Sequence, residues 1–248
     1  MQPGELVKLG FPAAYMEQIA SFFAAQRASL LISGTAVSKG RDGVVPDNPY
    51  GPHTALSELR TSTVNSQEVR IDKRLLPDFR LVIKHPNFFT ATLSTLLSHY
   101  SCYAIVRNPL AVLLSWQTIK APVNEGYLPF GEAFDADLKS ELKAEPDRLD
   151  RQLIILRWYF SRYASLLPRD HVIRYEEVVS SGGRALEVIE PAAAMLDEPL
   201  ESRNANVLYD ASLVRQLADR LLNQPLIYSS FYRQSEVEDL CKKWTLDH

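Results

Sequence analysis

Two pairs of polar residues follow apolar runs in the middle of the chain, and their types suit an anionic ligand. A mainly apolar run at residues 80–83 leads into Lys84 and His85, and a second apolar run leads into Arg107 and Asn108. Lysine and arginine can hold phosphate or sulfate oxygens, and an imidazole can accept a proton near neutral pH. These residues together suggest a site where an anion is bound and a proton is moved.

The pattern around these residues predicts two strands that are joined by a helix. Apolar residues recur at helical spacing over residues 88–97, and Pro86 and Pro109 each follow a predicted strand. Two parallel strands with a connecting helix form a βαβ unit, which binds ligands beyond the carboxyl ends of its strands. Strands at residues 80–83 and 103–106 would therefore bring the two polar pairs to one edge of a sheet.

The charge pattern also favours an anion-binding centre. The whole chain has a formal net charge of −3, yet the 46 residues between Asp78 and Glu125 contain no acidic residue, where the average density predicts about five or six. Burial of this segment in the core would also explain the missing carboxylates. It explains less well why cations and a histidine stand at the strand ends.

The segment YAIVRNPLAVLLSW resembles the 3′-phosphate-binding segment of sulfotransferases that use 3′-phosphoadenosine-5′-phosphosulfate (PAPS). In that family a strand ends in Arg-Asp/Asn-Pro, and a serine follows eight residues after the arginine. Arg107, Asn108 and Ser115 match this spacing. The resemblance implies that these three residues bind the cofactor, with the arginine fork, the serine hydroxyl and the N-terminus of the following helix facing the phosphate.

Two further segments resemble the same family, in the same order along the chain. LVIKHP is similar to the segment that carries the catalytic base, so the resemblance implies that His85 deprotonates the acceptor and that Lys84 stabilises charge on the bridging oxygen. His85 stands one residue closer to its lysine than in the family pattern. HVIRYEEVV is similar to a late strand that ends in a tyrosine–acid pair, Tyr175 and Glu176, for which a structural role is expected. The resemblance covers roughly residues 79–196.

The resemblance implies an α/β fold with three α/β/α layers and a central, mostly parallel sheet, similar to the P-loop sulfotransferases. A length of 248 residues suits one domain over residues 1–248. Within it we expect an irregular N-terminal region at 30–72 and a loop and helix insertion at 120–150. The insertion would lie near the acceptor pocket or form a surface loop. Amphipathic helices are predicted at residues 11–28, 153–167 and 212–222.

The family's phosphosulfate-binding loop has one partial counterpart. That loop follows a strand and opens a helix, and its backbone N–H groups hold the anion. Ser33, Gly34 and Thr35 have the same residue types as the centre of that loop and are the candidate cofactor-binding residues here. No Pro-Lys precedes them, and Gly40, with further glycine and proline residues beyond it, opposes a helix afterwards. Two alternatives stay open, namely a gene start further upstream and a relative that binds the nucleotide without transferring a group.

Composition restricts the remaining possibilities. The sequence has no apolar run long enough to span a membrane, and the segment MQPGELVKLG does not read as a signal peptide. Two cysteines and five scattered histidines predict neither a disulfide framework nor a metal site. We therefore expect a cytoplasmic protein that needs no metal. Its expected partner is a small-molecule or carbohydrate acceptor, without nucleic acid, and it could form a homo-oligomer.

Three functions are compared on this basis. The leading hypothesis is transfer of a sulfuryl group from PAPS to a hydroxyl or amine of an acceptor that the sequence does not identify. The second is a phosphotransferase on a similar fold, which is disfavoured because no Gly-Lys-Ser/Thr loop follows a strand. The third is a non-catalytic nucleotide-binding relative.

Overall fold

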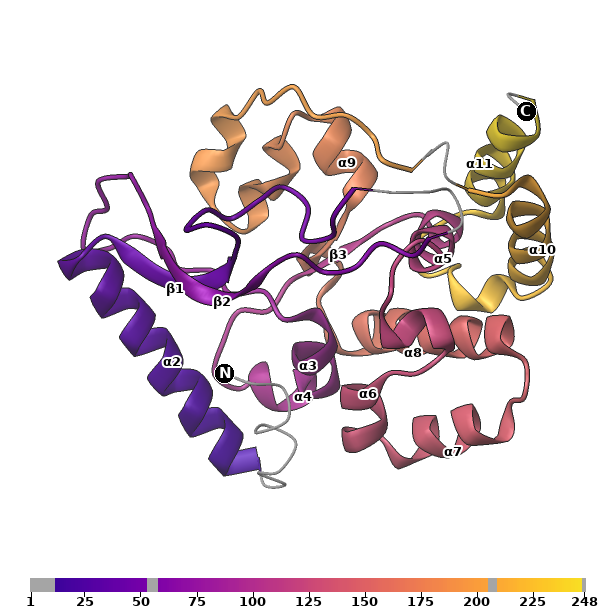
Figure 1. Ribbon diagram of the computed structural model, residues 1–248, viewed down its shortest axis with the longest axis horizontal. Helices are drawn as coiled ribbons and strands as arrows, with labels where there is room; N and C mark the ends of the chain where they lie inside the picture. The colour runs from indigo at the N-terminus through magenta and orange to yellow at the C-terminus, as the bar shows by residue number, and fades with distance from the viewer. Residues whose placement is uncertain (1–11, 53–57, 205–208, 247–248) are drawn as a thin grey trace. The chain divides into compact units, whose positions relative to one another are not determined.

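The chain forms a mixed α/β structure, in which most elements are helices (Figure 1). The computed structural model describes residues 12–52, 58–204 and 209–246. It divides into two compact units, Met1–His85 and Pro86–His248. The prediction of one domain over the whole chain stays a prediction. Within the described residues no helix is long and apolar enough to cross a membrane.

The first unit is a long helix against a two-stranded antiparallel sheet (Figure 1). Helix α2 spans Pro12–Ile32, and strands β1 (Thr35–Gly40) and β2 (Asn65–Arg70) pair from Thr35↔Arg70 to Gly40↔Asn65. The buried Gln26 on α2 accepts a hydrogen bond from the Val37 N–H of β1 at 2.7 Å. The helix and the sheet are thus joined by a polar contact as well as by apolar packing.

The sequence prediction for this unit was wrong in one respect. The region 30–72 begins with the last residues of α2 and contains two strands, where an irregular region was expected. The glycine and proline residues after residue 39 do prevent a helix, but they leave extended pairing possible. The predicted helix at 11–28 is confirmed from residue 12 onward, while residue 11 lies outside the described residues.

The predicted strand at residues 80–83 does not form. These residues have no regular secondary structure, although their side chains alternate between exposed and half-buried positions, as in a strand. An extended segment becomes a strand only when its N–H and C=O groups pair with a neighbour. The predicted βαβ unit of residues 80–106 is therefore absent from the described structure, and strand β3 takes a different partner.

The second unit holds one parallel strand pair and most of the helices. Its strands and helices are β3 (Ala104–Val106), β4 (Val172–Arg174), α3 (Pro86–Ala91), α4 (Leu93–Leu96), α5 (Pro109–Trp116), α6 (Pro129–Phe134), α7 (Ala136–Ala144), α8 (Arg148–Leu166), α9 (Tyr175–Ser180), α10 (Ala211–Leu222) and α11 (Gln234–Leu246). Five short 3-10 helices connect them, at Pro122–Glu125, Arg169–His171, Arg184–Val188, Pro191–Met195 and Pro225–Ile227. The described sheets have only two strands each, so the expected three-layer arrangement stays a prediction.

Helix α5 is the centre of the core of this unit. It packs against α8, α10 and α11, and Leu110, Leu113 and Leu114 are fully buried. Asn108 caps its first turn, because the Asn108 Oδ1 accepts a hydrogen bond from the Leu110 N–H at 3.1 Å. Pro109 at the first helical position fixes the backbone where no donor is needed. The sequence predicted correctly that a helix follows this strand and Pro109.

The aromatic residues of the 120–150 insertion divide between core and surface. Phe130 and Phe134 pack against the buried Phe88, with ring centroids 5.4 Å and 5.9 Å apart. Tyr127 is exposed and lies under the guanidinium of Arg151, at 4.8 Å. Two of the three aromatics therefore stabilise the second unit, and only Tyr127 remains a surface residue.

Candidate functional site

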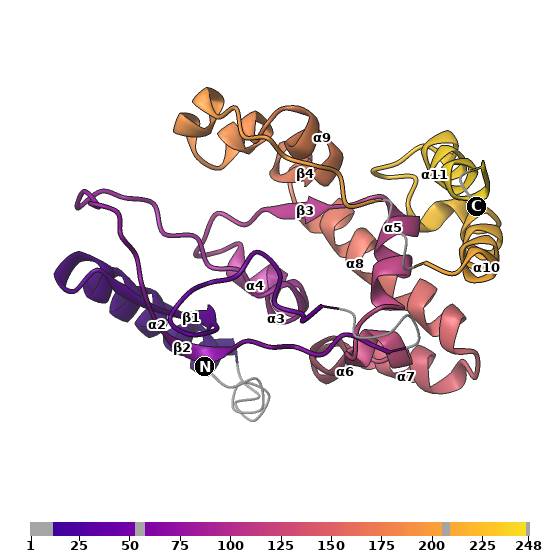
Figure 2. The ribbon, with the colours of Figure 1, turned by 45° about the horizontal axis from the view of Figure 1, so that its top comes forward.

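The candidate site lies at the carboxyl ends of β3 and β4. The two strands pair in parallel, with Ala104 opposite Val172 and Val106 opposite Arg174 (Figure 2). Because the strands run the same way, the residues that follow them come to one edge. Arg107 and Asn108 follow β3 there, and Tyr175 and Glu176 follow β4.

Arg107 is a half-buried cation that forms no ion pair with a carboxylate in the described part of the chain. Its Nε donates to the Asn204 Oδ1 at 2.6 Å, and its Nη2 donates to the backbone oxygen of Arg203. The guanidinium also lies over the Tyr175 ring, at 5.2 Å. Since a guanidinium has five N–H groups, these contacts leave about three for a ligand.

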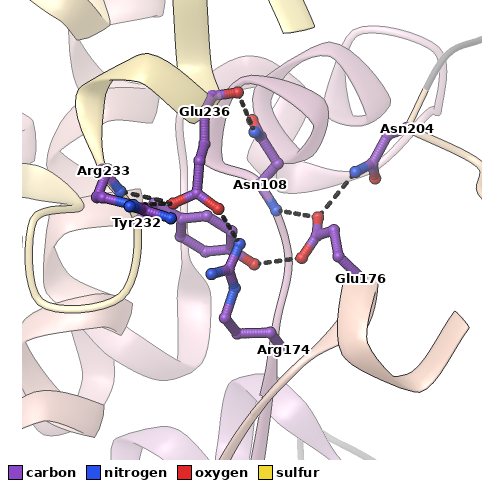
Figure 3. A network of polar contacts seen from close by, with 7 residues as sticks. All are labelled: Asn108, Arg174, Glu176, Asn204, Tyr232, Arg233 and Glu236. Atoms are coloured by element: carbon purple, nitrogen blue, oxygen red, sulfur yellow. Dashed lines mark hydrogen bonds and ion pairs between the residues drawn. The ribbon is translucent and has the colours of Figure 1, made fainter. Parts of the chain in front are cut away.

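Glu176 joins three elements of the site through its carboxylate (Figure 3). Its Oε1 accepts from the Asn108 N–H at 2.9 Å and from the Asn204 Nδ2 at 2.7 Å. Its Oε2 accepts from the Tyr232 hydroxyl at 2.7 Å. Burial raises the pKa of Tyr232, and its hydrogen bond to the Glu176 carboxylate raises it further. The structural role that the sequence suggested for Glu176 agrees with these contacts.

The Glu176 carboxylate also changes the expected anion site at the start of α5. The resemblance implied that backbone N–H groups at this helix end would face a phosphate. In the structure the Asn108 N–H is already bound to Glu176, and the Asn108 Nδ2 donates to the backbone oxygen of Glu236 at 3.0 Å. Asn108 therefore holds the helix end in place, and the candidate anion contact here is the Arg107 guanidinium.

A second carboxylate, Glu236, anchors helix α11 to this edge (Figure 3). It pairs with the Arg174 Nη2 at 2.5 Å and accepts from the Arg233 N–H at 2.8 Å. The Arg174 guanidinium lies over the Tyr232 ring at 4.4 Å. Burial alone would raise the pKa of Glu236, but the Arg233 N–H and the charge of Arg174 outweigh it, so this pKa is lowered.

Glu236→Gln should therefore reduce stability in a pH-dependent way. Because the pKa of Glu236 in the folded chain lies below its ordinary value of 4.5, its stabilising contribution is complete above that value and is lost as the pH falls through the folded-state pKa. Near neutral pH we expect Glu236→Gln to lower the free energy of unfolding by about 1–3 kcal/mol. Urea titrations toward acidic pH should show this difference shrinking.

Asp239→Asn is the control for this measurement, because Asp239 pairs with Lys242 on the surface, where both side chains are about two-thirds exposed. An exposed pair of this kind contributes little. A difference for Glu236→Gln that stayed constant at all pH values would contradict the assigned role of the carboxylate.

Ser115 lies on α5, about two helical turns beyond Asn108. Its side chain is half-buried, and no hydrogen bond joins its hydroxyl to Arg107 among the described residues. The structure thus places Arg107 and Asn108 together and Ser115 further along the same helix. A shared ligand contact for Arg107 and Ser115 stays a prediction.

Lys84 and His85 belong to the first unit, so their joint action with Arg107 also stays a prediction. Lys84 is exposed and His85 is half-buried. Burial lowers the pKa of His85 below its ordinary value of 6.5, and the charge of Lys39 lowers it further. A neutral imidazole is the form that can accept a proton, so this shift suits a general base.

The structure gives Ser33, Gly34 and Thr35 a different position from the expected loop. They follow the C-terminus of α2 and lead into β1, whereas a phosphosulfate loop precedes a helix. The Ser33 N–H and hydroxyl both bond to the Ser29 oxygen, at 2.9 Å and 2.8 Å. The C-terminal end of a helix carries partial negative charge, which disfavours an anion. Their local surroundings thus differ from those of a phosphosulfate loop, and cofactor binding by these three residues stays a prediction.

Sequence reasoning did not single out Asn204 or Tyr232, or the partners Arg174 and Glu236. Their contacts join residues far apart in the chain, such as Arg107 and Asn204, which are separated by 97 positions. One local signal was present for Glu236. It stands three residues after Arg233 at the start of α11, where an acidic side chain often reaches back to the preceding N–H.

The arrangement offers a cation, Arg107, that pairs with no described carboxylate, together with two tyrosines and two carboxylates that bond to other groups of the protein. The site can bind an oxyanion at Arg107. None of the described contacts of Arg107 is with a serine, cysteine or histidine side chain. No group of three His, Cys, Asp or Glu residues in the described ranges is placed to hold a metal ion. No family model, curated protein or solved structure matches this chain.

Proposed function

We propose that the chain binds a 3′-phosphorylated adenine nucleotide at Arg107 and transfers the sulfuryl group of PAPS. The observation that supports this most is the position of Arg107. It follows the first of two parallel strands, precedes a capped helix with a fully buried face, and pairs with no described carboxylate. A cation held by neutral partners keeps its charge for a ligand, and a strand end before a helix is where such folds bind nucleotides.

In the proposed reaction the acceptor hydroxyl or amine attacks the sulfur of PAPS. His85 takes the acceptor proton, the bond between sulfur and the bridging oxygen breaks, and adenosine 3′,5′-bisphosphate leaves. Lys84 stabilises the charge on the bridging oxygen, while Arg107 and Ser115 hold the 3′-phosphate. The low pKa of His85 supports its part in this scheme.

The finer features of the fold and setting belong to the same proposal. We place the β3–β4 pair within a three-layer α/β/α fold with a mostly parallel sheet, similar to the P-loop sulfotransferases. The proposal also includes a small-molecule or carbohydrate acceptor, a cytoplasmic location and a homo-oligomeric state. Cys102 and Cys241 form no disulfide in the described part of the chain, which suits a reducing compartment.

A non-catalytic nucleotide-binding protein is the second candidate function. It is favoured by the position of Ser33, Gly34 and Thr35 at the C-terminus of α2, because no other described loop resembles the phosphosulfate-binding loop. Such a protein would bind adenosine 3′,5′-bisphosphate without transferring sulfate from PAPS. Binding and turnover therefore have to be measured separately.

Arg107→Ala tests the proposed site. We expect the purified chain to bind adenosine 3′,5′-bisphosphate in calorimetric titrations and the variant to bind it about 10- to 150-fold more weakly. This corresponds to the loss of about 1.5–3 kcal/mol of charge-assisted hydrogen bonding. ATP with Mg²⁺ serves as the control ligand, and tighter binding of ATP would favour the phosphotransferase alternative.

Arg169→Ala is the matched control variant, because Arg169 is an exposed arginine whose guanidinium lies over Phe231 at 5.2 Å, as that of Arg107 lies over Tyr175. If the folded wild-type chain and Arg107→Ala bound the bisphosphate with equal affinity, the proposed binding site at Arg107 would be refuted. Transfer of the labelled sulfuryl group from PAPS to a panel of hydroxyl acceptors then distinguishes the enzyme from the non-catalytic relative.

A further inference from the structure

Asn204 stands between the cation and the carboxylate of the candidate site. Its Oδ1 accepts from the Arg107 Nε at 2.6 Å. Its Nδ2 donates to the Glu176 Oε1 at 2.7 Å (Figure 3). A single amide group thus connects Arg107 to Glu176, and the described structure contains no direct ion pair between them.

A primary amide can make both contacts from one short side chain. The guanidinium has donors but no acceptor, and the ionised carboxylate has acceptors but no donor. The residue between them must therefore accept on one side and donate on the other. Aspartate could accept from Arg107 but would meet Glu176 with a like charge, and alanine could do neither.

Removing the amide would leave two opposite charges one amide group apart. Arg107 is otherwise held by the Arg203 backbone oxygen and by the Tyr175 ring, neither of which carries a charge. Among the described contacts of Arg107, no other neutral group would then lie between its guanidinium and Glu176. A direct pair would use the N–H groups and the charge that an anionic ligand needs.

We propose that Asn204 is a positioning residue for anion binding, which keeps Arg107 available by holding it apart from Glu176. This inference rests on the proposed binding of a phosphorylated nucleotide at Arg107. It goes beyond that proposal because it assigns a role to a residue outside the Arg-Asn-Pro segment. It also explains how a cation and a carboxylate can share one edge of the sheet without neutralising each other.

The test is a set of variants titrated with adenosine 3′,5′-bisphosphate. Asn204→Ala should weaken binding about tenfold, because Arg107 pairs with Glu176. Adding Glu176→Gln should return the affinity to within about threefold of Glu176→Gln alone, since no carboxylate is left to compete. Asn204→Asp should weaken binding at least as much, and Glu176→Gln should not rescue it, because the introduced carboxylate would itself pair with Arg107.

Three outcomes would overturn the inference. Unchanged affinity of Asn204→Ala would mean that the spacer is not needed, and tighter binding would mean that Asn204 competes with the ligand. A loss that Glu176→Gln does not rescue would mean that Asn204 only shapes its own segment. Tryptophan fluorescence and circular dichroism establish that each variant is folded.

A structural measurement separates this inference from the proposed function. A crystal structure of Asn204→Ala without ligand should place an Arg107 nitrogen within about 4 Å of a Glu176 carboxylate oxygen. Failure of the folded wild-type chain to bind the bisphosphate would remove the proposed function, while this structure would still decide whether Asn204 separates the two charges. An Arg107 side chain that stayed apart from Glu176 would refute the spacer role.

Discussion

Leu114→Ala is expected to lower the free energy of unfolding of the second unit by about 3–5 kcal/mol. Leu114 is fully buried on α5, the helix that packs against α8, α10 and α11. Truncating it removes apolar contacts and leaves a cavity that these neighbours can fill only in part. The loss is large compared with the total stability of a typical domain, so a substantial fraction of the variant should unfold at moderate urea concentrations.

Tryptophan fluorescence in urea measures this effect directly. All three tryptophans of the chain lie between Pro86 and His248, so the signal reports on the second unit. Leu226→Ala is the matched control, because Leu226 is 88% exposed and its truncation should change stability by less than about 0.5 kcal/mol. Similar midpoints for the two variants would show that α5 is not the centre of this core.

Glu176→Ala is expected to destabilise the same unit by about 2–4 kcal/mol. The substitution leaves the Asn108 N–H and the Tyr232 hydroxyl without their acceptor, and both residues are buried. An unsatisfied buried donor costs more than the hydrogen bond contributes when it is formed, because it has also lost its contact with water. The variant should therefore lose more stability than the partial exposure of the Glu176 side chain suggests.

Glu177→Ala provides the comparison, since Glu177 is the next residue on α9 and is exposed. It should unfold within about 0.5 kcal/mol of the wild-type chain. The pH dependence of tyrosine absorbance gives a second readout. The pKa of Tyr232 should fall in Glu176→Ala, because the carboxylate that disfavours the phenolate is gone. A Tyr232 pKa that did not change would contradict the assigned hydrogen bond.

The parts of the fold that the sequence predicted well are those with local causes. Asn108 and Pro109 predict the start of α5 because a cap and a proline act on the residues beside them. The predicted strand at residues 80–83 does not form, because a strand depends on a non-local cause. Its apolar pattern was present, but a strand also depends on a pairing partner, and β3 pairs with β4, which begins 68 positions after it.

The candidate site shows the same limit. Arg107 was found from its own segment, since its strand, proline and helix are neighbours in the sequence. Asn204 and Tyr232 come from distant segments, and their side chains reach the site only because the tertiary structure brings them there. Ser33 shows a further limit of local patterns, because the Ser-Gly-Thr motif follows a helix, where the partial negative charge of the helix end disfavours an anion.

The parallel β3–β4 pair has a consequence for how the molecule reaches its native state. Asn108 and Glu176 are 68 positions apart, and Asn108 and Glu236 are 128 apart, so closing these contacts costs chain entropy that local helices do not lose. High contact order slows folding. The helices should form first and the candidate site last, so refolding chains should regain helical circular dichroism before they gain the proposed affinity for nucleotide.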